Sequence, residues 1–355
     1  MKQIFAFLFL FSCSIGLSAQ INGCQTLLKV VKQGDQAKVT QLLKKTNPNC
    51  SHRGDGEPRS PLGAAARAGD LAMGKLLIQN GAKATYMGSG DASMLMLAVQ
   101  GENLDFVQLL LQNGAKVNRK VSGDGTALLM AAKTGNESIL DYLIQQGADV
   151  NETVPGDGSP LIVAVKRGHL GATKLLVENG AKPDLYVPGD ESPLYKAVKS
   201  RNTTILKILL QAKNIDVNAE LPGDGTLLII AAKSGDLELL EMLLAAGAEV
   251  EKGVKGDGNP LIQAAKHGHL DLAKRLVIAG AKIDTHVIGD ETPLINAAGQ
   301  GHLAMVQYLV NQGADVNKTV RDGYTMRSEK RSPLLMARRG GHQDVIDYLI
   351  SKGAK

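Results

Sequence analysis

The sequence predicts an all-α solenoid of about ten helix–loop–helix copies joined by short hairpin-like fingers. A Ser, Thr or Asn cap recurs at positions 60, 93, 126, 159, 192, 226, 259, 292 and 332, spaced by 33 residues except for one 34 and one 40. Such a fixed period is the signature of a repeat architecture. The chain has no Trp and only 3% aromatic residues, which suits thin stacked layers of Leu, Ala and Val better than one large core.

Each element of the copy has a physical reason, as the unit beginning at Ser159 shows. The Ser159 hydroxyl can cap a helix, and Pro160 fits the first helical position, where no N–H is needed. The apolar run 161–165 forms a short inner helix that Gly168 ends. A second, outer helix follows from residue 169 to about 179, with Leu and Ala at helical spacing. One such pair is too small to fold alone, so neighbouring copies must stack.

The first residues differ from the array and predict a signal peptide at 1–19. Lys2 precedes an apolar run over 4–11, and Ser18-Ala19 provide a small-residue cleavage site after Ala19. A buried N-terminal helix is the alternative. No second apolar stretch is long enough to span a membrane. The repeat domain then covers 20–355, with copies near 25–59, 60–92, 93–125, 126–158, 159–191, 192–225, 226–258, 259–291, 292–331 and 332–355.

Export determines how the three cysteines are interpreted. Removal of Cys13 with the signal leaves Cys24 and Cys50, an even pair that predicts a disulfide in an exported chain. Two free or packed thiols are the alternative. The residues before Cys13 and Cys24 loosely resemble a lipidation box, so a lipoprotein is also considered. We therefore expect an exported protein that is periplasmic or secreted, with lipid anchoring as a variant.

The copies resemble the ankyrin repeat. The segments that carry the likeness are Gly-Asp-Gly-Ser-Pro-Leu, then Lys-Arg-Gly-His-Leu, Asn-Gly-Ala and Gly-Ala-Asp-Val-Asn, the last at 147–151 and 313–317. The likeness extends over 25–355 and is closest to bacterial-type, exported arrays. It departs from the family at the residue after the Pro-Leu pair, where Tyr195, for instance, replaces the usual His. The resemblance implies a concave face built from fingers and inner helices.

Two rows of charge run through the copies. The acidic row lies in the fingers, where we interpret the aspartates chiefly as turn residues, with a cation-binding or basic-partner stripe as the alternative. Its members are Asp55, Asp91, Asp124, Asp157, Asp190, Asp224, Asp257, Asp290 and Asp322. The basic row lies seven residues after the caps, where the resemblance places the end of each inner helix. Its candidate partner-binding members are Arg67, Lys133, Lys166, Lys199, Lys233 and Lys266. Compensation of the helix dipole is the alternative role.

Irregular copies are further candidates, because the consensus does not explain them. In the copy 192–225, Arg201 replaces the loop glycine. The finger at 317–331 is longer than the others and carries Arg321, Tyr324 and Arg327 as candidate partner contacts, since Tyr and Arg are favoured at interfaces. A tolerated insertion is the alternative.

The function predicted from these features is a non-catalytic scaffold that binds a protein partner on the concave face. A secreted effector, or a periplasmic helper of a neighbouring enzyme, is the alternative. We find no nucleophile–base set, metal cluster or cofactor loop, and we expect no enzyme and no cofactor. A formal net charge of +5 and few aromatic residues disfavour nucleic acid as a partner. We expect a monomer.

Overall fold

The computed structural model describes residues 23–52, 59–86, 92–287, 290–321 and 330–355. These residues fall into two compact units. The first comprises the chain up to Lys182 together with Val187–Asp190, and the second comprises Pro183–Tyr186 and Glu191–Lys355. The predicted signal peptide at 1–19 lies outside the described residues.

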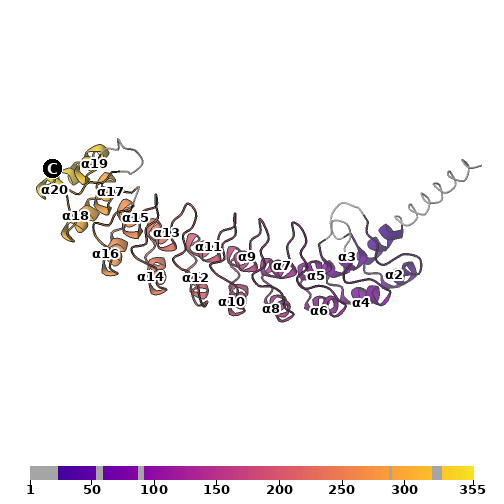
Figure 1. Cartoon of the computed structure of the whole chain (residues 1–355). Helices are drawn as coiled ribbons and strands as arrows, with labels where there is room; N and C mark the ends of the chain where they lie inside the picture. The colour runs from indigo at the N-terminus through magenta and orange to yellow at the C-terminus, as the bar shows by residue number, and fades with distance from the viewer. Residues whose placement is uncertain (1–22, 53–58, 87–91, 288–289, 322–329) are drawn as a thin grey trace, which may run out of the picture. The chain divides into compact units, whose positions relative to one another are not determined.

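In the first unit, helices alternate between an inner and an outer layer (Figure 1). A helical stretch over 23–32 pairs with the first outer helix, and four regular pairs follow. The labelled helices are α2 (Gln36–Leu43), α3 (Pro61–Ala68), α4 (Leu71–Gln79), α5 (Met94–Gln100), α6 (Leu104–Gln112), α7 (Ala127–Thr134), α8 (Glu137–Gln145), α9 (Pro160–Arg167) and α10 (Leu170–Glu178). Inner helices α3, α5, α7 and α9 pack in succession, as do outer helices α4, α6, α8 and α10.

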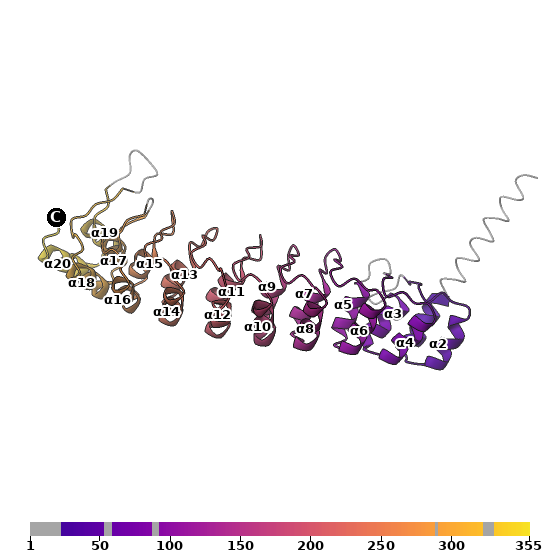
Figure 2. The same cartoon turned by 60° about the horizontal axis from the view of Figure 1, so that its bottom comes forward.

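The second unit repeats this arrangement in five pairs (Figure 2). Its helices are α11 (Pro193–Lys199), α12 (Thr203–Leu209), α13 (Leu227–Ser234), α14 (Leu237–Ala245), α15 (Pro260–Lys266), α16 (Leu270–Ile278), α17 (Pro293–Gly299), α18 (Leu303–Asn311), α19 (Pro333–Gly340) and α20 (Gln343–Ser351). The odd-numbered inner helices stack on one another and the even-numbered outer helices do the same. The described residues thus confirm the predicted all-α solenoid.

The predicted caps begin all nine inner helices from α3 to α19. Each Ser, Thr or Asn side chain at the nine recurring positions accepts the backbone N–H three residues later, as Ser159 does from Ile162 at 3.3 Å. Gly168 ends α9 in the left-handed region, with φ 75°, which a residue without a Cβ adopts at no steric cost. Local chemistry therefore sets the ends of these short helices.

The core lies between the layers and consists of small and branched apolar side chains. Paired alanines on the inner helices, such as Ala131 and Ala132, are fully buried and allow close approach of neighbouring helices. Gly74 of α4 has the same effect in the outer layer, because a Cβ there would lie 2.5 Å from Cζ of Phe106 on α6. Helices of seven to nine residues are marginal alone, so this interlayer packing provides most of their stability.

Asparagine side chains in the loops join one copy to the next. Asn151 donates its Nδ2 to the Gly180 carbonyl at 3.0 Å and accepts the Lys182 N–H on its Oδ1 at 2.9 Å. The same two-way bond recurs at Asn49, Asn118, Asn218 and Asn317. These residues, which we call the loop asparagines, fix the spacing of successive loops.

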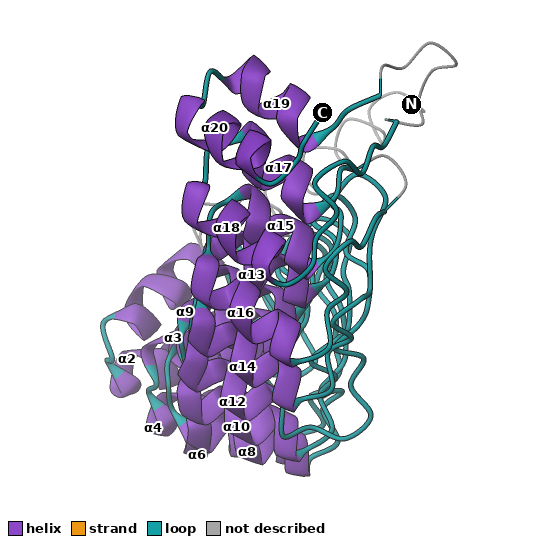
Figure 3. Cartoon of the chain, turned by 90° about the vertical axis from the view of Figure 1, so that its left-hand side faces the viewer, coloured by secondary structure: helices purple, strands orange, loops and turns teal. Residues whose placement is uncertain are grey.

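The described fingers contain no β-strands. In the described residues they are closed by single bridges rather than strands, at Val121–Gly125, Val154–Gly158, Leu221–Gly225, Val254–Gly258 and Val320–Arg331. Figure 3 shows that the loops lie together beside the helical layers within each unit. The fingers therefore place their turn residues next to the ends of the inner helices.

A disulfide closes the first copy. It joins Cys24, in the helical stretch 23–32, to Cys50 in the following loop, with a Cα–Cα distance of 5.8 Å. Because the separation along the chain is 26 residues, the crosslink restricts the whole first helix pair.

Candidate protein-binding surface

The basic row lies where it was expected, in the last turn of the inner helices. Arg67 is in α3, Lys133 in α7 and Lys166 in α9 of the first unit. In the second unit Lys199, Lys233 and Lys266 occupy the last turns of α11, α13 and α15. A cation at this end of a helix also interacts favourably with the unpaired carbonyls there.

In one copy the structure pairs a member of the acidic row with a member of the basic row, and the sequence had indicated no contact between them. The Lys233 Nζ lies 2.7 Å from Oδ1 of Asp257, and both groups are partly buried. The lysine precedes the finger aspartate by 24 residues, and the same interval separates Lys266 from Asp290. Because the same interval separates Lys133 from Asp157 and Lys166 from Asp190, two pairs of described residues that form no ion pair, the spacing alone does not reveal which copies pair their charges.

Asp290 shows how deeply a finger carboxylate can sit. Burial raises its pKa above the usual range, although the Lys266 charge and the Gly258 backbone N–H act in the opposite direction. Within the described residues, Oδ2 of Asp290 and Oδ2 of Asp190 are buried without a hydrogen-bond partner. Some of the aspartates are thus more than turn residues, because Asp257 pairs with Lys233 and Asp290 accepts from the Gly258 N–H of the preceding finger.

Lys199 is engaged in a polar cluster of the irregular copy. Its Nζ donates to the Tyr195 hydroxyl at 2.5 Å, and that hydroxyl donates to Oδ2 of Asp224 at 2.5 Å. Tyr195 is only 1% exposed. Burial is the main cause that raises its pKa far above the usual range, and the hydrogen bond to the Asp224 carboxylate is the second. Lys196 pairs with Glu191 beside it, at 2.6 Å. The sequence showed Tyr195 only as a departure from the family pattern.

Other basic side chains remain open to solvent. Lys133 and Lys166, on consecutive copies of the first unit, are exposed and form no ion pair with any described residue. Lys266 is likewise exposed. Lys133 and Lys166 can therefore contact an acidic partner without breaking an ion pair, whereas the Lys266 charge also acts on Asp290.

The long finger is described only at its base. Val320 and Arg331 bridge it, and Arg331 pairs with Glu291 at 2.7 Å. Arg321 is exposed there. The candidate contacts Tyr324 and Arg327 lie outside the described residues.

The histidines at the start of the outer helices serve the repeat. Nε2 of His169 lies 3.3 Å from the Lys133 carbonyl of the preceding copy, and His269, His302 and His342 make the corresponding contact. Within the described part of the chain no group of three His, Cys, Asp or Glu side chains is placed to hold a metal ion. In the same part, no helix has the length and apolar character needed to cross a bilayer.

Stacked helix pairs, capped inner helices and fingers define an α-helical repeat protein. The model of the family described as ankyrin repeats (3 copies) matches residues 27–121, 95–187, 128–220, 187–255 and 261–355. Among solved structures, the chain is similar to the ankyrin repeat domain of human ASB11, at 28% identity and a TM-score of 0.50, over 62% of this chain and 96% of that domain. A search of curated proteins found no match.

The chain belongs to the ankyrin-repeat family. Ankyrin repeats are generally protein–protein interaction scaffolds, and proteins built from them are typically non-catalytic. The fold therefore favours a protein partner over a small-molecule substrate.

Proposed function

We propose that this protein is an exported, non-catalytic scaffold that holds a protein partner on the face formed by its inner-helix ends and fingers. The observation that carries the proposal is the pair Lys133 and Lys166. Both end inner helices of consecutive copies, and both are exposed without an ion pair among the described residues. A partner with acidic side chains would gain contacts there at little desolvation cost.

The coupling of the two charge rows restricts which residues serve this purpose. Lys233 is neutralised by Asp257, and Lys199 is bonded to Tyr195, so each contributes first to its own copy. Their replacement would disturb the fold as well as binding. The contacts that can be assigned to a partner are therefore the exposed cations, to which Arg321 at the base of the long finger adds one more.

The proposal of export rests on the N-terminal sequence and on the disulfide. Disulfides persist in oxidising compartments and are rare in the cytosol. The Cys24–Cys50 bond also occupies the Cys24 sulfur, which is then not available for attachment of a lipid. Of the two cysteines considered for anchoring, this leaves Cys13, which lies outside the described residues.

The proposal is tested by capture of the partner in the native cell. The full chain and the variant Lys133→Ser/Lys166→Ser are crosslinked in the exported fraction, and the captured proteins are identified by mass spectrometry. A partner that is recovered with the native chain should be lost, or reduced about tenfold, with the variant.

The matched control is Lys75→Ser/Lys174→Ser, which removes the same charge from outer helices α4 and α10. It should capture the partner normally. Equal recovery with all three proteins would refute the assignment of the inner-helix ends, and thermal unfolding of each protein establishes that the variants are folded.

A further inference from the structure

A pocket opens between two consecutive loops of the second unit, one just before the irregular copy and one within it. Its volume is about 240 Å³. One loop contributes Asp184 and Tyr186, and the next contributes Asp216, Glu220 and Pro222. Leu194 of α11, Leu227 of α13 and the loop residue Leu221 supply apolar walls. Pockets for drug-sized molecules measure about 300–1,000 Å³, so this space suits a single side chain.

Hydrogen bonds hold two of the carboxylates in place. Oδ2 of Asp184 accepts the Asp216 backbone N–H at 3.1 Å, and Oδ1 of Asp216 accepts the Asn218 N–H at 2.9 Å. Neither carboxylate forms an ion pair with a described residue. The nearest cation to Glu220 is Nζ of Lys252, at 3.9 Å and only weakly coupled to so exposed a group. The pocket therefore carries negative charge that the fold does not neutralise.

Asp184 stands eight residues before the next cap, where some copies carry a loop asparagine and others an acidic residue, Glu251 or Asp284. An asparagine such as Asn151 both accepts a backbone N–H and donates to a glycine carbonyl of the next copy. Asp184 keeps the accepting bond but has no N–H to donate. The exchange removes one bond between copies and adds a charge to the pocket wall.

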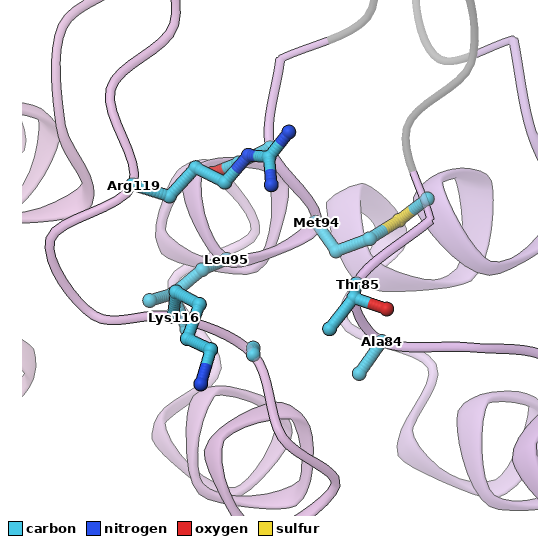
Figure 4. Close-up of a pocket in the computed structure, with 8 residues that line it drawn as sticks. Ala84, Thr85, Met94, Leu95, Lys116 and Arg119 are labelled. Carbon is cyan, nitrogen blue, oxygen red and sulfur yellow. The ribbon is translucent and has the colours of Figure 1, made fainter.

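The corresponding pocket of the first unit has the opposite charge. It is lined by Thr85 and Leu95, at the positions of Asp184 and Leu194, and by Lys116 and Arg119 of the following loop (Figure 4). That space measures only about 20 Å³, so the residues of each pair of loops determine both the size and the charge of the space between them. The acidic lining at 184–220 is therefore set by the residues of these two loops, and Asp284 and Asp315 occupy the positions of Asp184 and Asp216 in a later pair of loops.

We propose that the acidic pocket binds a basic side chain, foremost an arginine, from an extended segment of the protein partner. The planar guanidinium offers five N–H donors and can reach carboxylates on both loops at once. Its aliphatic stem would lie along Leu194, Leu221 and the exposed ring of Tyr186. This inference rests on the proposed scaffold function and adds to it the chemistry of one contact.

The test titrates the full chain with the peptide acetyl-Gly-Arg-Gly-amide and with its citrulline analogue, which has the same shape but no charge. Binding is followed by saturation-transfer NMR. The arginine peptide should bind at least about fivefold more tightly than the citrulline peptide, in line with the modest energy of exposed ion pairs. Equal binding of the two peptides would overturn the proposal.

Variants assign the effect to the pocket. Asp184→Asn/Asp216→Asn keeps the accepting oxygens and removes both charges, and it should abolish the preference for arginine. Glu220→Gln, which changes an exposed side chain that the fold does not need, should reduce the preference in part. The matched control is Asp149→Asn, at the loop position of Asp216 but in the first unit, where Oδ1 likewise accepts a backbone N–H.

The control should bind both peptides as the native chain does. If Asp149→Asn reduces the preference for arginine as much as the double variant, charge at a distance explains the binding and the pocket assignment is wrong. The peptide titration needs no natural partner, so its result stands whether or not the crosslinking experiment recovers one. Lys133 and Lys166 do not line the pocket, so the crosslinking experiment with Lys133→Ser/Lys166→Ser tests the scaffold function separately from the pocket.

Discussion

Asn151 offers the most direct measure of what the loop asparagines contribute. Its side chain makes two bonds to the next copy, to the Gly180 carbonyl at 3.0 Å and from the Lys182 N–H at 2.9 Å. A typical net contribution is about 0.5–1.5 kcal/mol for each hydrogen bond, and exposed bonds lie at the low end. Asn151→Ala should therefore lower the free energy of unfolding by about 1–2 kcal/mol.

Two measurements check this expectation. Urea unfolding gives the loss of stability, and native-state hydrogen exchange reports the local opening at the Lys182 amide, whose acceptor is removed. A loss of about 1.4 kcal/mol corresponds to a tenfold fall in protection at that amide. Asn151→Asp, which keeps the acceptor but not the donor, should lie between the native chain and Asn151→Ala.

Asn113→Ala serves as the control, because Asn113 bonds only to the Leu109 carbonyl of its own helix, at 2.8 Å. It should leave the exchange of the Lys182 amide unchanged. If Asn151→Ala costs no more than Asn113→Ala in both measurements, the loop asparagines do not join the copies as we describe.

Three further changes follow from the structure. Replacement of Cys24 and Cys50 by serine should lower stability by about 3 kcal/mol, measured by urea unfolding under oxidising conditions, because the first helix pair loses its crosslink. Gly74→Ala should cost about 1–3 kcal/mol and lower the Tm, since its Cβ would lie 2.5 Å from Cζ of Phe106. Asp290→Asn should raise the stability at pH 7, because burial opposes the charged carboxylate. The pKa of Asp290 is higher in the folded state than in the unfolded state, so the native chain loses stability as the pH rises through the folded pKa. The stability advantage of Asp290→Asn should therefore shrink toward pH 3. Urea unfolding repeated at several pH values measures this.

Two control substitutions test the reasoning behind the predictions for Gly74 and Asp290. Gly299→Ala, in helix α17 with its nearest neighbour 3.4 Å from the added Cβ, should not destabilise and can gain up to about 1 kcal/mol. Asp257→Asn should have the opposite sign to Asp290→Asn at pH 7, because it removes the ion pair with Lys233. Equal effects in either pair would contradict the packing and charge arguments above.

The sequence was sufficient to predict the copy and its ends. Caps such as Ser159, the proline that follows and the terminating Gly168 act within a few residues, so their roles follow from local chemistry. The paired charges were missed because Lys233 and Asp257 lie 24 residues apart, and only the folded finger brings them together. Each row was recognised, but the contact between the rows was not.

The loop asparagines and the buried tyrosine were missed for a related reason. Asn151 was visible in the Gly-Ala-Asp-Val-Asn segment, but its partners lie in the following copy, where no spacing rule pointed. Tyr195 was visible as an exception, but its hydroxyl contact with Asp224 depends on the next finger. In a solenoid, therefore, a single copy predicts its own helices, whereas contacts made by a finger or across a copy boundary need the folded structure.

The irregular copy and the loop that leads into it carry several departures from the most regular copies. Arg201 and Asn214 occupy the left-handed region, with φ 54° and 58°, at positions where glycine would avoid a cost on the order of 1 kcal/mol each. Arg201 offsets part of this by donating to the Ser234 carbonyl at 2.7 Å. Asp184 gives up a bond that the loop asparagines make. The positive φ of Arg201 has a counterpart at Glu102, nine residues after the cap of an earlier copy, so it does not by itself point to binding. The exchange at Asp184 lies in the wall of the acidic pocket, where the added charge serves the proposed arginine contact at the expense of one bond between copies.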